Sequence, residues 1–396
     1  MKKTIKDVNF NDKTTLVRVD FNVPVKDGIV TDDKRIRAAL PTIKYLIENN
    51  AKLVIFSHLG RVKNEEDKTK NTIEPVAKKF EQLLGKKITF INATRGKELE
   101  SAIKDLKSGE IVMFQNTRYE DFVDGKETKF ESKNDSKLGK YWAGLGEIFV
   151  NDAFGTAHRE HASNVGIAKN IKESALGFLM EKEVSVYEEI LKDPKRPFVA
   201  VMGGSKVSDK ILLIDKMLEI ADKIIIIGAM ANTFLKAQNK SVGISRIEED
   251  KIDLAKKYLD SNPGKFVLPI DFTVAPEFKD IKGKEVSEIP EGEMALDIGK
   301  KSIKLFKKTL KNAKTIVWNG PAGVFEFKNF ENGTKKLCGI IAKNSGLTVV
   351  GGGDSAAAAI KYGYENKFKH VSTGGGASLE YLEGKELPGI KAIQEK

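Results

Sequence analysis

One pattern is repeated along the whole chain and limits the folds that the chain can adopt. A short apolar run is followed by a loop of Gly, Asn, Asp or basic residues, and then by a stretch with helical periodicity. Short apolar runs bounded by turn residues are typical of buried strands, and their alternation with helices predicts parallel sheets covered on both faces. The runs occur at 15–21, 53–56, 88–91, 111–114, 148–150, 198–202, 224–227, 266–269, 315–318 and 348–350.

The number of runs and the chain length together indicate two domains. Two sheets of about five or six strands fit 396 residues better than one large sheet. A helix is predicted over 179–191, and Pro194 and Pro197 end it before the next strand. We therefore predict an α/β protein with two doubly wound, Rossmann-like domains, over 1–173 and 194–378, joined by a bridging helix within 174–193 and a hinge.

The composition distinguishes poorly between functions, but it predicts the cellular compartment. The net charge of +11 suits anionic ligands of any kind, and the lysines are interspersed with acidic residues rather than gathered in blocks. The first residues carry no apolar signal segment, and no run approaches the roughly 20 residues of a membrane span. A single cysteine, Cys338, suits a reducing compartment. We expect a cytoplasmic protein that needs neither a membrane nor nucleic acid.

The segment 198–218 near the middle of the chain carries the first sign of ligand chemistry. An apolar run ends at Gly203 and Gly204, and Val207, Ile211, Ile214 and Leu218 then recur at helical spacing. This spacing predicts a helix on which Lys206 and Lys210 share another face of the first turns. Glycine amides, a helix N-terminus and two ammonium groups would favour an anion. The alternative at this point is a turn with two solvated surface lysines.

In the first half of the chain, the loops after the predicted strands carry groups that bind anions. Ligands of doubly wound sheets bind beyond the carboxyl ends of the strands. Guanidinium groups bind phosphate and carboxylate in a bidentate way, and Asp or Asn can bind hydroxyls. A single arginine is more often a surface ion-pair former, but the common position predicts a small ligand with several negative charges. The candidates are Asp20, Asn22, Arg35, His58, Arg61, Arg118 and Arg159.

In the second half, the corresponding loops are rich in glycine. The segments 318–323, 351–355 and 373–377 join Gly203 and Gly204 in this respect. The loop at 351–355 opens an alanine-rich helix, a favourable place for phosphate. Asp354 could hold Mg²⁺ or could serve only as a helix N-cap, and Glu326 could accept a ribose hydroxyl. Neither a Walker A pattern nor a G-x-G-x-x-G pattern is present.

Together these segments closely resemble the phosphoglycerate kinase family, whose motifs occur in the same order over nearly the whole chain. The matching segments are RVDFN-P at 18–24, SHLGR at 57–61, NDAFGTAHR at 151–159, GG-x-K-V-x-D-K at 203–210, WNGP-G-FE at 318–326, GGGDS at 351–355 and STGGGASLE at 372–380.

The resemblance implies reversible phosphoryl transfer between 1,3-bisphosphoglycerate and ADP, which gives 3-phosphoglycerate and MgATP. The arginine-rich set named above would bind the phosphoglycerate. The resemblance assigns the transferring group to Arg35, Lys206, Lys210, Gly353 and Gly376. It assigns the nucleotide to Gly204, Lys206, Lys210, Asn319, Glu326, Gly352, Gly353, Asp354 and Ser355, with Mg²⁺ at Asp354.

The same resemblance bears on the assembly of the domains. It implies that residues 379–396 pack back on the first domain. Because substrates on separate domains must be brought together to react, we also expect the enzyme to close, with the glycines near Gly374 and the 179–191 helix as hinge candidates. We expect a monomer. Val62, Ala295 and Lys300 depart from residues common in the family, which affects local loop shape only.

Two other function classes stay open at this stage. The net charge allows a non-catalytic anion-binding or RNA-binding protein, and a different ATP-dependent ligase could use a similar two-domain frame. Turnover of ATP with 3-phosphoglycerate would distinguish all three.

Overall fold

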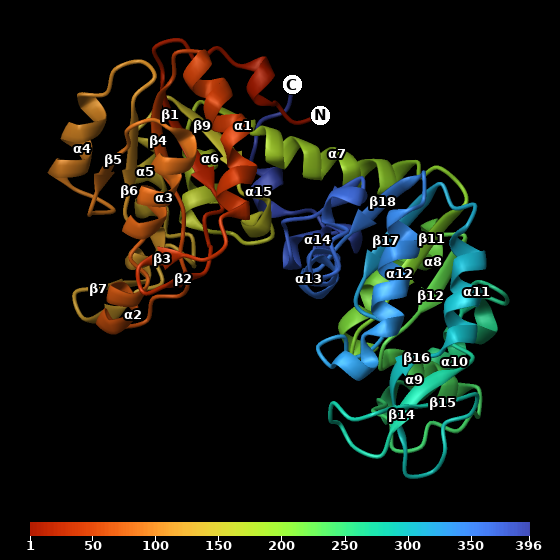
Figure 1. Cartoon of the computed structure of the whole chain (residues 1–396). Helices are drawn as coiled ribbons and strands as arrows, with labels where there is room; N and C mark the ends of the chain where they lie inside the picture. The colour runs from red at the N-terminus through yellow and green to blue at the C-terminus, as the bar shows by residue number, and fades with distance from the viewer. The chain divides into compact units, whose positions relative to one another are not determined.

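The computed structural model describes residues 1–396, which form two compact units. Unit 1 comprises Met1–Ser185 and Glu386–Lys396, and unit 2 comprises Val186–Lys385. Each unit is built around a six-stranded, fully parallel sheet with helices, as Figure 1 shows. The predicted α/β class with two parallel sheets is confirmed. The finer domain bounds expected from the sequence remain a prediction.

The sheet of unit 1 has the strand order β10-β9-β1-β4-β6-β5. Parallel register pairs Arg18 of β1 with Phe56 of β4 on one side and with Asn151 of β9 on the other. The three strands therefore end at the same edge. The bounds are β1 Thr14–Val19, β4 Lys52–Phe56, β5 Thr89–Ile91, β6 Ile111–Phe114, β9 Ile148–Asp152 and β10 Glu173–Leu176, and two small hairpins are β2 Val25–Lys26 with β3 Ile29–Val30 and β7 Phe122–Val123 with β8 Lys126–Glu127.

Helices pack on both faces of this sheet. On one face, buried strand residues such as Val17 and Ile55 share a core with Ile43 of α1 and Phe80 of α3. On the other face, Phe56 stacks on Phe114 at a ring distance of 5.1 Å. The helices of unit 1 are α1 Lys34–Glu48, α2 Glu65–Lys70, α3 Glu74–Leu84, α4 Lys97–Lys104, α5 Ser136–Ala143, α6 Ile167–Asn170 and α15 Pro388–Lys391.

The sheet of unit 2 has the order β13-β12-β11-β17-β18-β19. Val201 and Trp318 of its strands share a core with Phe306 of α11 and Leu337 of α12. The strands are β11 Phe198–Met202, β12 Lys223–Ile226, β13 Phe266–Val267, β17 Thr315–Asn319, β18 Leu347–Val350 and β19 His370–Val371, and the helices are α8 Ile211–Ile220, α9 Met230–Ala237, α10 Ile252–Ser261, α11 Lys300–Leu310, α12 Asn332–Ala342, α13 Gly353–Lys361 and α14 Gly376–Leu382.

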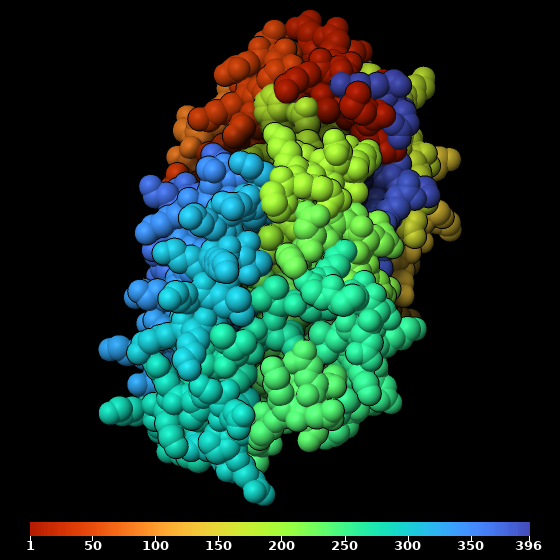
Figure 2. Space-filling view, turned by 90° about the vertical axis from the view of Figure 1, so that its right-hand side faces the viewer, coloured from red at the N-terminus to blue at the C-terminus, as the bar shows by residue number.

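Each of the ten predicted runs contains a strand, but nine further strands were missed in the two units, four of them in the hairpins β2-β3 and β7-β8. β10 and β19 are edge strands that are too short or too polar to stand out from loops. An antiparallel sheet, β15-β14-β16, was also missed. Its strands are β14 Phe272–Ala275, β15 Lys284–Val286 and β16 Met294–Ile298. It lies at one end of unit 2 in Figure 1, and Figure 2 shows green and cyan residues of this region at the same end.

The predicted helix after Gly204 was wrong in its start and in its buried face. A 3₁₀ turn covers Ser208–Lys210, and α8 begins at Ile211. This turn is held by a distant residue, because the Ser208 amide and hydroxyl both donate to Glu248. The buried residues of α8 are Leu213, Ile214 and Met217, so Ile211 and Leu218 do not form the predicted stripe.

The predicted helix over 179–191 is present as α7, Phe178–Lys192, and the boundary between the units falls inside it. Its first turn is fixed in unit 1, where the amides of Leu179 and Met180 donate to Oδ1 of Asp152. The two ends of the chain lie together on unit 1, as Figures 1 and 2 show, and Lys2 forms an ion pair with Glu395 at 2.8 Å. None of the helices combines the length and apolar character that a bilayer span requires.

Trp142 of α5 provides a test of the packing in unit 1. Its side chain is fully buried, lies 6.0 Å from the Phe114 ring and donates from Nε1 to the Thr94 carbonyl at 2.9 Å. We expect Trp142→Ala to lower the free energy of unfolding by about 3–5 kcal/mol, because it leaves a cavity and an unpaired carbonyl. Urea denaturation measures this change. Lys140→Ala, on the exposed side of the same helix, is the control, and an equal loss in both variants would contradict the packing described here.

Candidate functional site

The loops that follow β1 and β4 are joined at the edge of the sheet in unit 1. Arg35, in the first turn of α1, forms an ion pair with Asp20 at 2.8 Å. Asn22 accepts the amide of Gly60 at 3.0 Å, which ties the loop after β1 to the loop that carries His58 and Arg61. Asn22 and Arg61 are exposed. These contacts bring the two loops to one place, as the parallel register requires.

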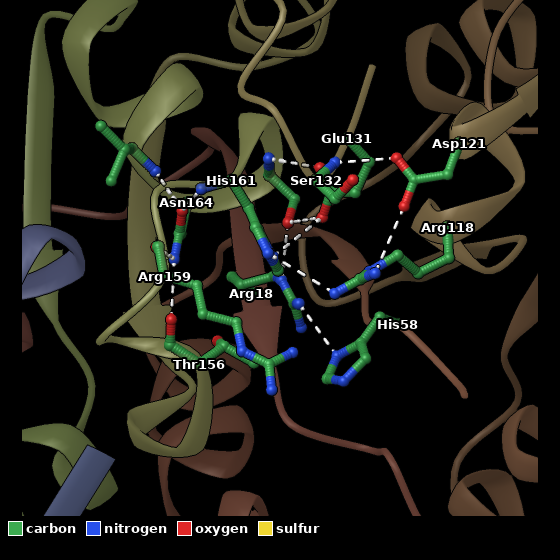
Figure 3. Close-up of polar contacts among 12 residues, drawn as sticks. Arg18, His58, Arg118, Asp121, Glu131, Ser132, Thr156, Arg159, His161 and Asn164 are labelled. Carbon is green, nitrogen blue, oxygen red and sulfur yellow. Dashed lines mark hydrogen bonds and ion pairs between the residues drawn. The ribbon is translucent and has the colours of Figure 1, made fainter. Parts of the chain in front are cut away.

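Behind these loops lies a cationic cluster, drawn in Figure 3, in which Arg18, His58 and Arg118 are buried and Arg159 is exposed. Arg18 donates from one terminal nitrogen to Nδ1 of His58 at 3.1 Å. Arg118 forms an ion pair with Asp121 at 3.3 Å. The guanidinium of Arg159 points toward the same region as Arg18 and His58. The structure therefore gathers His58, Arg118 and Arg159, which are far apart in sequence, around Arg18.

The electrostatics of this cluster favour an anion. Burial, reinforced by the charges of Arg18 and Arg118, holds the pKa of His58 well below its ordinary value. Burial together with the charge of Arg118 lowers the pKa of His161 to about 2. Both imidazoles are therefore neutral, since protonation would place more positive charge beside buried guanidinium groups. A ligand with several negative charges would relieve this excess of positive charge.

Sequence reasoning missed the buried members of the cluster. Arg18 was read only as part of a motif, although it is fully buried, and Glu131, His161 and Ser163 were not singled out as site residues. They lie behind the residues that reach the surface. The one available signal was an arginine inside a predicted buried strand, because a buried guanidinium requires polar partners.

In unit 2, the glycine-rich loops enclose a cavity of about 330 Å³. Because β11, β17 and β18 are parallel neighbours, the loops after these strands meet at one edge. Nine of the ten residues predicted for the nucleotide and the transferring group on this half line the cavity, namely Gly204, Lys206, Lys210, Asn319, Gly352, Gly353, Asp354, Ser355 and Gly376.

A hydrogen-bonded frame fixes the wall of this cavity. Lys210 donates from Nζ to Oδ1 of Asn319. Asn319 donates from Nδ2 to the Gly351 carbonyl at 2.9 Å, and the Gly320 amide donates to Oγ of Ser355 at 2.6 Å. Burial lowers the pKa of Lys210, while the charges of nearby carboxylates oppose this change.

The N-terminus of α13 opens on the same cavity, and its shape requires glycine. Gly352 precedes the helix with a φ of +89°, a backbone conformation that residues with a side chain rarely adopt. A Cβ atom there would lie 2.7 Å from Nδ2 of Asn319. Gly353 and Asp354 begin the helix and are exposed, so the first amides and their partial positive charge can face an anion.

A second cavity of about 510 Å³ adjoins the first and shares Gly204, Ser205 and Asp354 with it. Its apolar wall includes Phe272, Phe278, Met294, Leu296 and Val324, which the sequence reasoning missed. Glu326, the tenth predicted residue, and Ala295 also line this cavity. The signal was weak, because these residues come from the antiparallel sheet and from loops spread over positions 272–326.

The donor set around the cavities bears on the expected metal. The structure contains no group of three or more His, Cys, Asp or Glu side chains that could hold a metal ion. Asp354 is exposed and lines both cavities. A single carboxylate of this kind fits Mg²⁺ that arrives with a nucleotide, because Mg²⁺ retains water and binds phosphate oxygens.

Comparisons with known proteins agree with this geometry. Residues 5–385 match the family model described as phosphoglycerate kinase. The phosphoglycerate kinases of Enterococcus faecalis and Fusobacterium nucleatum are each 59% identical to the chain, and the matches cover 100% of both sequences in each case.

The chain belongs to the phosphoglycerate kinase family. Solved structures agree. The chain resembles phosphoglycerate kinase from Coxiella burnetii with a TM-score of 0.89 at 38% identity, covering 99% of this chain and 98% of that one. Phosphoglycerate kinase from Pyrococcus horikoshii gives 0.83 at 33% identity with the same coverage. Membership confirms the family resemblance seen in the sequence, and it gives no support to a non-catalytic RNA-binding protein.

Asp297 in the wall of the larger cavity makes stability depend on pH. It is buried, accepts the amides of Gly333 at 2.6 Å and Ile298 at 2.9 Å, and burial raises its pKa from 3.8 to about 7. Between about pH 4 and pH 7 the folded chain retains a proton that the unfolded chain has released, so stability falls as pH rises through this window, by at most about 4 kcal/mol.

We expect Asp297→Asn to flatten this part of the pH profile, because the amide cannot ionise. Urea denaturation of the full chain at intervals from pH 4 to pH 8 measures the effect. Asp260→Asn, at an exposed position, is the control and should keep the wild-type profile. Identical profiles for Asp297→Asn and wild type would show that Asp297 does not titrate in this range.

Proposed function

We propose that this chain catalyses the reversible transfer of the acyl phosphoryl group of 1,3-bisphosphoglycerate to ADP, which gives 3-phosphoglycerate and ATP. The observation that carries the proposal is membership of the phosphoglycerate kinase family over residues 5–385. A coupled assay with ATP and 3-phosphoglycerate tests it, and absence of turnover in the purified protein would overturn it. We further propose a monomeric, cytoplasmic enzyme.

We assign phosphoglycerate binding to the edge of unit 1. His58, Arg118 and Arg159 would surround the phosphate or carboxylate, where their excess positive charge finds a partner. Asp20 would accept a hydrogen bond from the hydroxyl group of the substrate, and Asn22 could accept from it or donate to it. Arg61 would contact the anion from the adjoining loop. Arg35 is held by Asp20, which leaves the other N–H groups of its guanidinium available for the transferring group.

We assign the nucleotide to the two adjoining cavities of unit 2. The smaller cavity, with Lys206, Lys210 and the amides at Gly352 and Gly353, would hold the phosphates. The larger apolar cavity would hold the nucleoside, and its volume is in the range usual for small-molecule sites. Glu326 lines that cavity and would accept a ribose hydroxyl.

This assignment leaves little covalent chemistry for the protein. The acyl phosphate is a reactive donor and ADP supplies the attacking oxygen, so catalysis consists of alignment and of neutralising the equatorial oxygens. Arg35, Lys206, Lys210 and the amides of Gly353 and Gly376 supply that positive potential. Asp354 would hold Mg²⁺, which supplies further neutralisation of the nucleotide phosphates when bound.

Transfer requires the two bound substrates to reach in-line contact, and exclusion of water protects the acyl phosphate from hydrolysis. We therefore propose a hinge motion, with α7 and the glycines near Gly374 as its candidate elements. The boundary between the units falls within α7, which supports this choice.

Arg35 and Lys206 are the side chains on which rate should depend most. We expect Arg35→Ala and Lys206→Ala each to lower kcat by at least about 100-fold, because a cation acting on the transferring group is worth roughly 10³–10⁵ in related phosphoryl chemistry. Steady-state kinetics with both substrates saturating measures the loss. Arg37→Ala is the control, since Arg37 lies on the same helix, is exposed and forms its ion pair with Asp33. Near-normal kcat would remove the residue from the transition state.

Gly352 tests whether the N-terminus of α13 binds the nucleotide. We expect Gly352→Ala to weaken ADP binding by at least about tenfold, because the new methyl group would press on Asn319 and force the backbone out of its left-handed conformation. Calorimetric titration with ADP measures the affinity.

Gly363→Ala, at the other end of α13, is the matched control. Its φ is +72°, and a Cβ there meets nothing within 4 Å, so it adds similar backbone strain away from the cavity. Equal ADP affinities for the two variants would argue against a nucleotide phosphate at Gly352.

A further inference from the structure

Glu131 is a buried carboxylate that lies behind the proposed phosphoglycerate site without touching its surface. It is fully buried in the segment between β8 and α5. Oε2 accepts the amide of Ser163 at 2.9 Å, and Oε1 lies 2.5 Å from the Ser163 hydroxyl. Oε1 is also 3.8 Å from Nδ1 of His161. Both oxygens therefore accept from Ser163. Burial raises the pKa of Glu131, while the charge of Arg18 and the two Ser163 donors oppose that rise.

Ser163 lies between Glu131 and Arg18, and the donor in each of its hydrogen bonds can be assigned from the chemistry of the guanidinium group. Arg18 donates from Nε to Oγ of Ser163 at 2.9 Å, and a guanidinium can only donate. The Ser163 oxygen is thus an acceptor toward Arg18, so its own proton is free to point to Glu131. The carboxylate consequently orients the hydroxyl, and the hydroxyl holds one edge of the Arg18 plane. Figure 3 labels Arg18 and Glu131 among the residues of this network.

The same argument assigns the proton of His58. Arg18 approaches Nδ1 of His58 at 3.1 Å with a group that can only donate, so Nδ1 must accept. A neutral imidazole then carries its single proton on Nε2. Burial and the charge of Arg18 lower the pKa of His58, which agrees with a neutral ring. His58 can therefore offer one N–H donor, from Nε2, to an anion.

A second branch leads from Glu131 to Arg118. One terminal nitrogen of Arg118 lies 3.5 Å from Nε2 of His161, at the limit of a hydrogen bond. Because the guanidinium can only donate, Nε2 of His161 accepts and Nδ1 carries the proton, 3.8 Å from Oε1 of Glu131. Through His161, Glu131 thus also stands behind Arg118 of the proposed site. No other carboxylate contacts Ser163 and His161 together in these networks.

We infer that Glu131 is a positioning residue for phosphoglycerate binding: through Ser163 it sets the plane of Arg18, and Arg18 in turn fixes His58 as an Nε2–H donor to the substrate anion. This inference rests on the proposed function. It assigns Glu131 a role in substrate affinity, in addition to satisfying buried polar groups.

Glu131→Gln tests the inference. The amide keeps the shape of the side chain, but only one of its ends accepts, so one Ser163 donor loses its partner. We expect KM for 3-phosphoglycerate to rise about tenfold, on the scale of one charge-assisted hydrogen bond, while ADP affinity stays unchanged. We also expect a change in the imidazole ¹⁵N spectrum of the free enzyme, in which the His58 signals are identified by their absence from His58→Gln. In wild type these signals should show a ring protonated only on Nε2, and in Glu131→Gln this pattern should be lost.

Glu127→Gln is the control, because it removes the same charge from an exposed position on β8. If Glu131 acts through His58, the effect of Glu131→Gln should shrink once His58 is replaced. In a His58→Gln background, Glu131→Gln should therefore raise KM for 3-phosphoglycerate by much less than tenfold. Should Glu131→Gln fail to fold, Ser163→Ala interrupts the same connection by removing one hydroxyl, and the same rise in KM is expected.

Two outcomes would overturn the inference. One is an unchanged His58 pattern together with an unchanged KM for 3-phosphoglycerate, and the other is a rise in KM that is just as large in the His58→Gln background. The proposed function fails separately, because it fails only if the wild-type enzyme does not turn over ATP with 3-phosphoglycerate.

Discussion

In a parallel sheet with helices packed on its faces, the strand interiors are apolar and the chain can present polar side chains only where the strands end. Both units obey this constraint. The register that pairs Arg18 with Phe56 and with Asn151 makes the loops after β1, β4 and β9 neighbours. In unit 2 the pairing of Met202 with Asn319 does the same for the glycine loops. The chemistry therefore follows from strand order, since each loop contributes one or two groups.

Under the proposed function, the two units would bind anions in different ways. Unit 1 buries guanidinium groups, which is costly, and it retains them by giving Arg18 acceptors from Ser163, Val19 and His58. Unit 2 presents main-chain amides and the N-terminus of α13, with Lys210 held by Asn319. Guanidinium forks suit a small substrate that must be oriented, whereas amides in glycine loops allow a close approach to a phosphate chain.

Much of this arrangement could be predicted from the sequence, because the features involved are local. Apolar runs mark strands, and Arg61, Lys206 and Asp354 lie shortly after such runs in recognisable motifs. What could not be predicted depends on distant partners. The helix after Gly204 starts late because Ser208 is bonded to Glu248, forty residues away. The antiparallel sheet was missed because its short strands gain their stability from one another and from the core they share.

The sequence by itself determined the α/β class, the family and the residue types of the proposed anion sites, because apolar periodicity and motif order are properties of the sequence alone. Only the tertiary structure decided which of these groups meet and in what protonation state. Glu131, Ser163 and Arg18 are far apart in sequence, and their hydrogen bonds exist only once β1 and the loops around it are packed. The neutral state of His58 is likewise a product of burial, since desolvation and the field of neighbouring guanidinium groups arise from the fold.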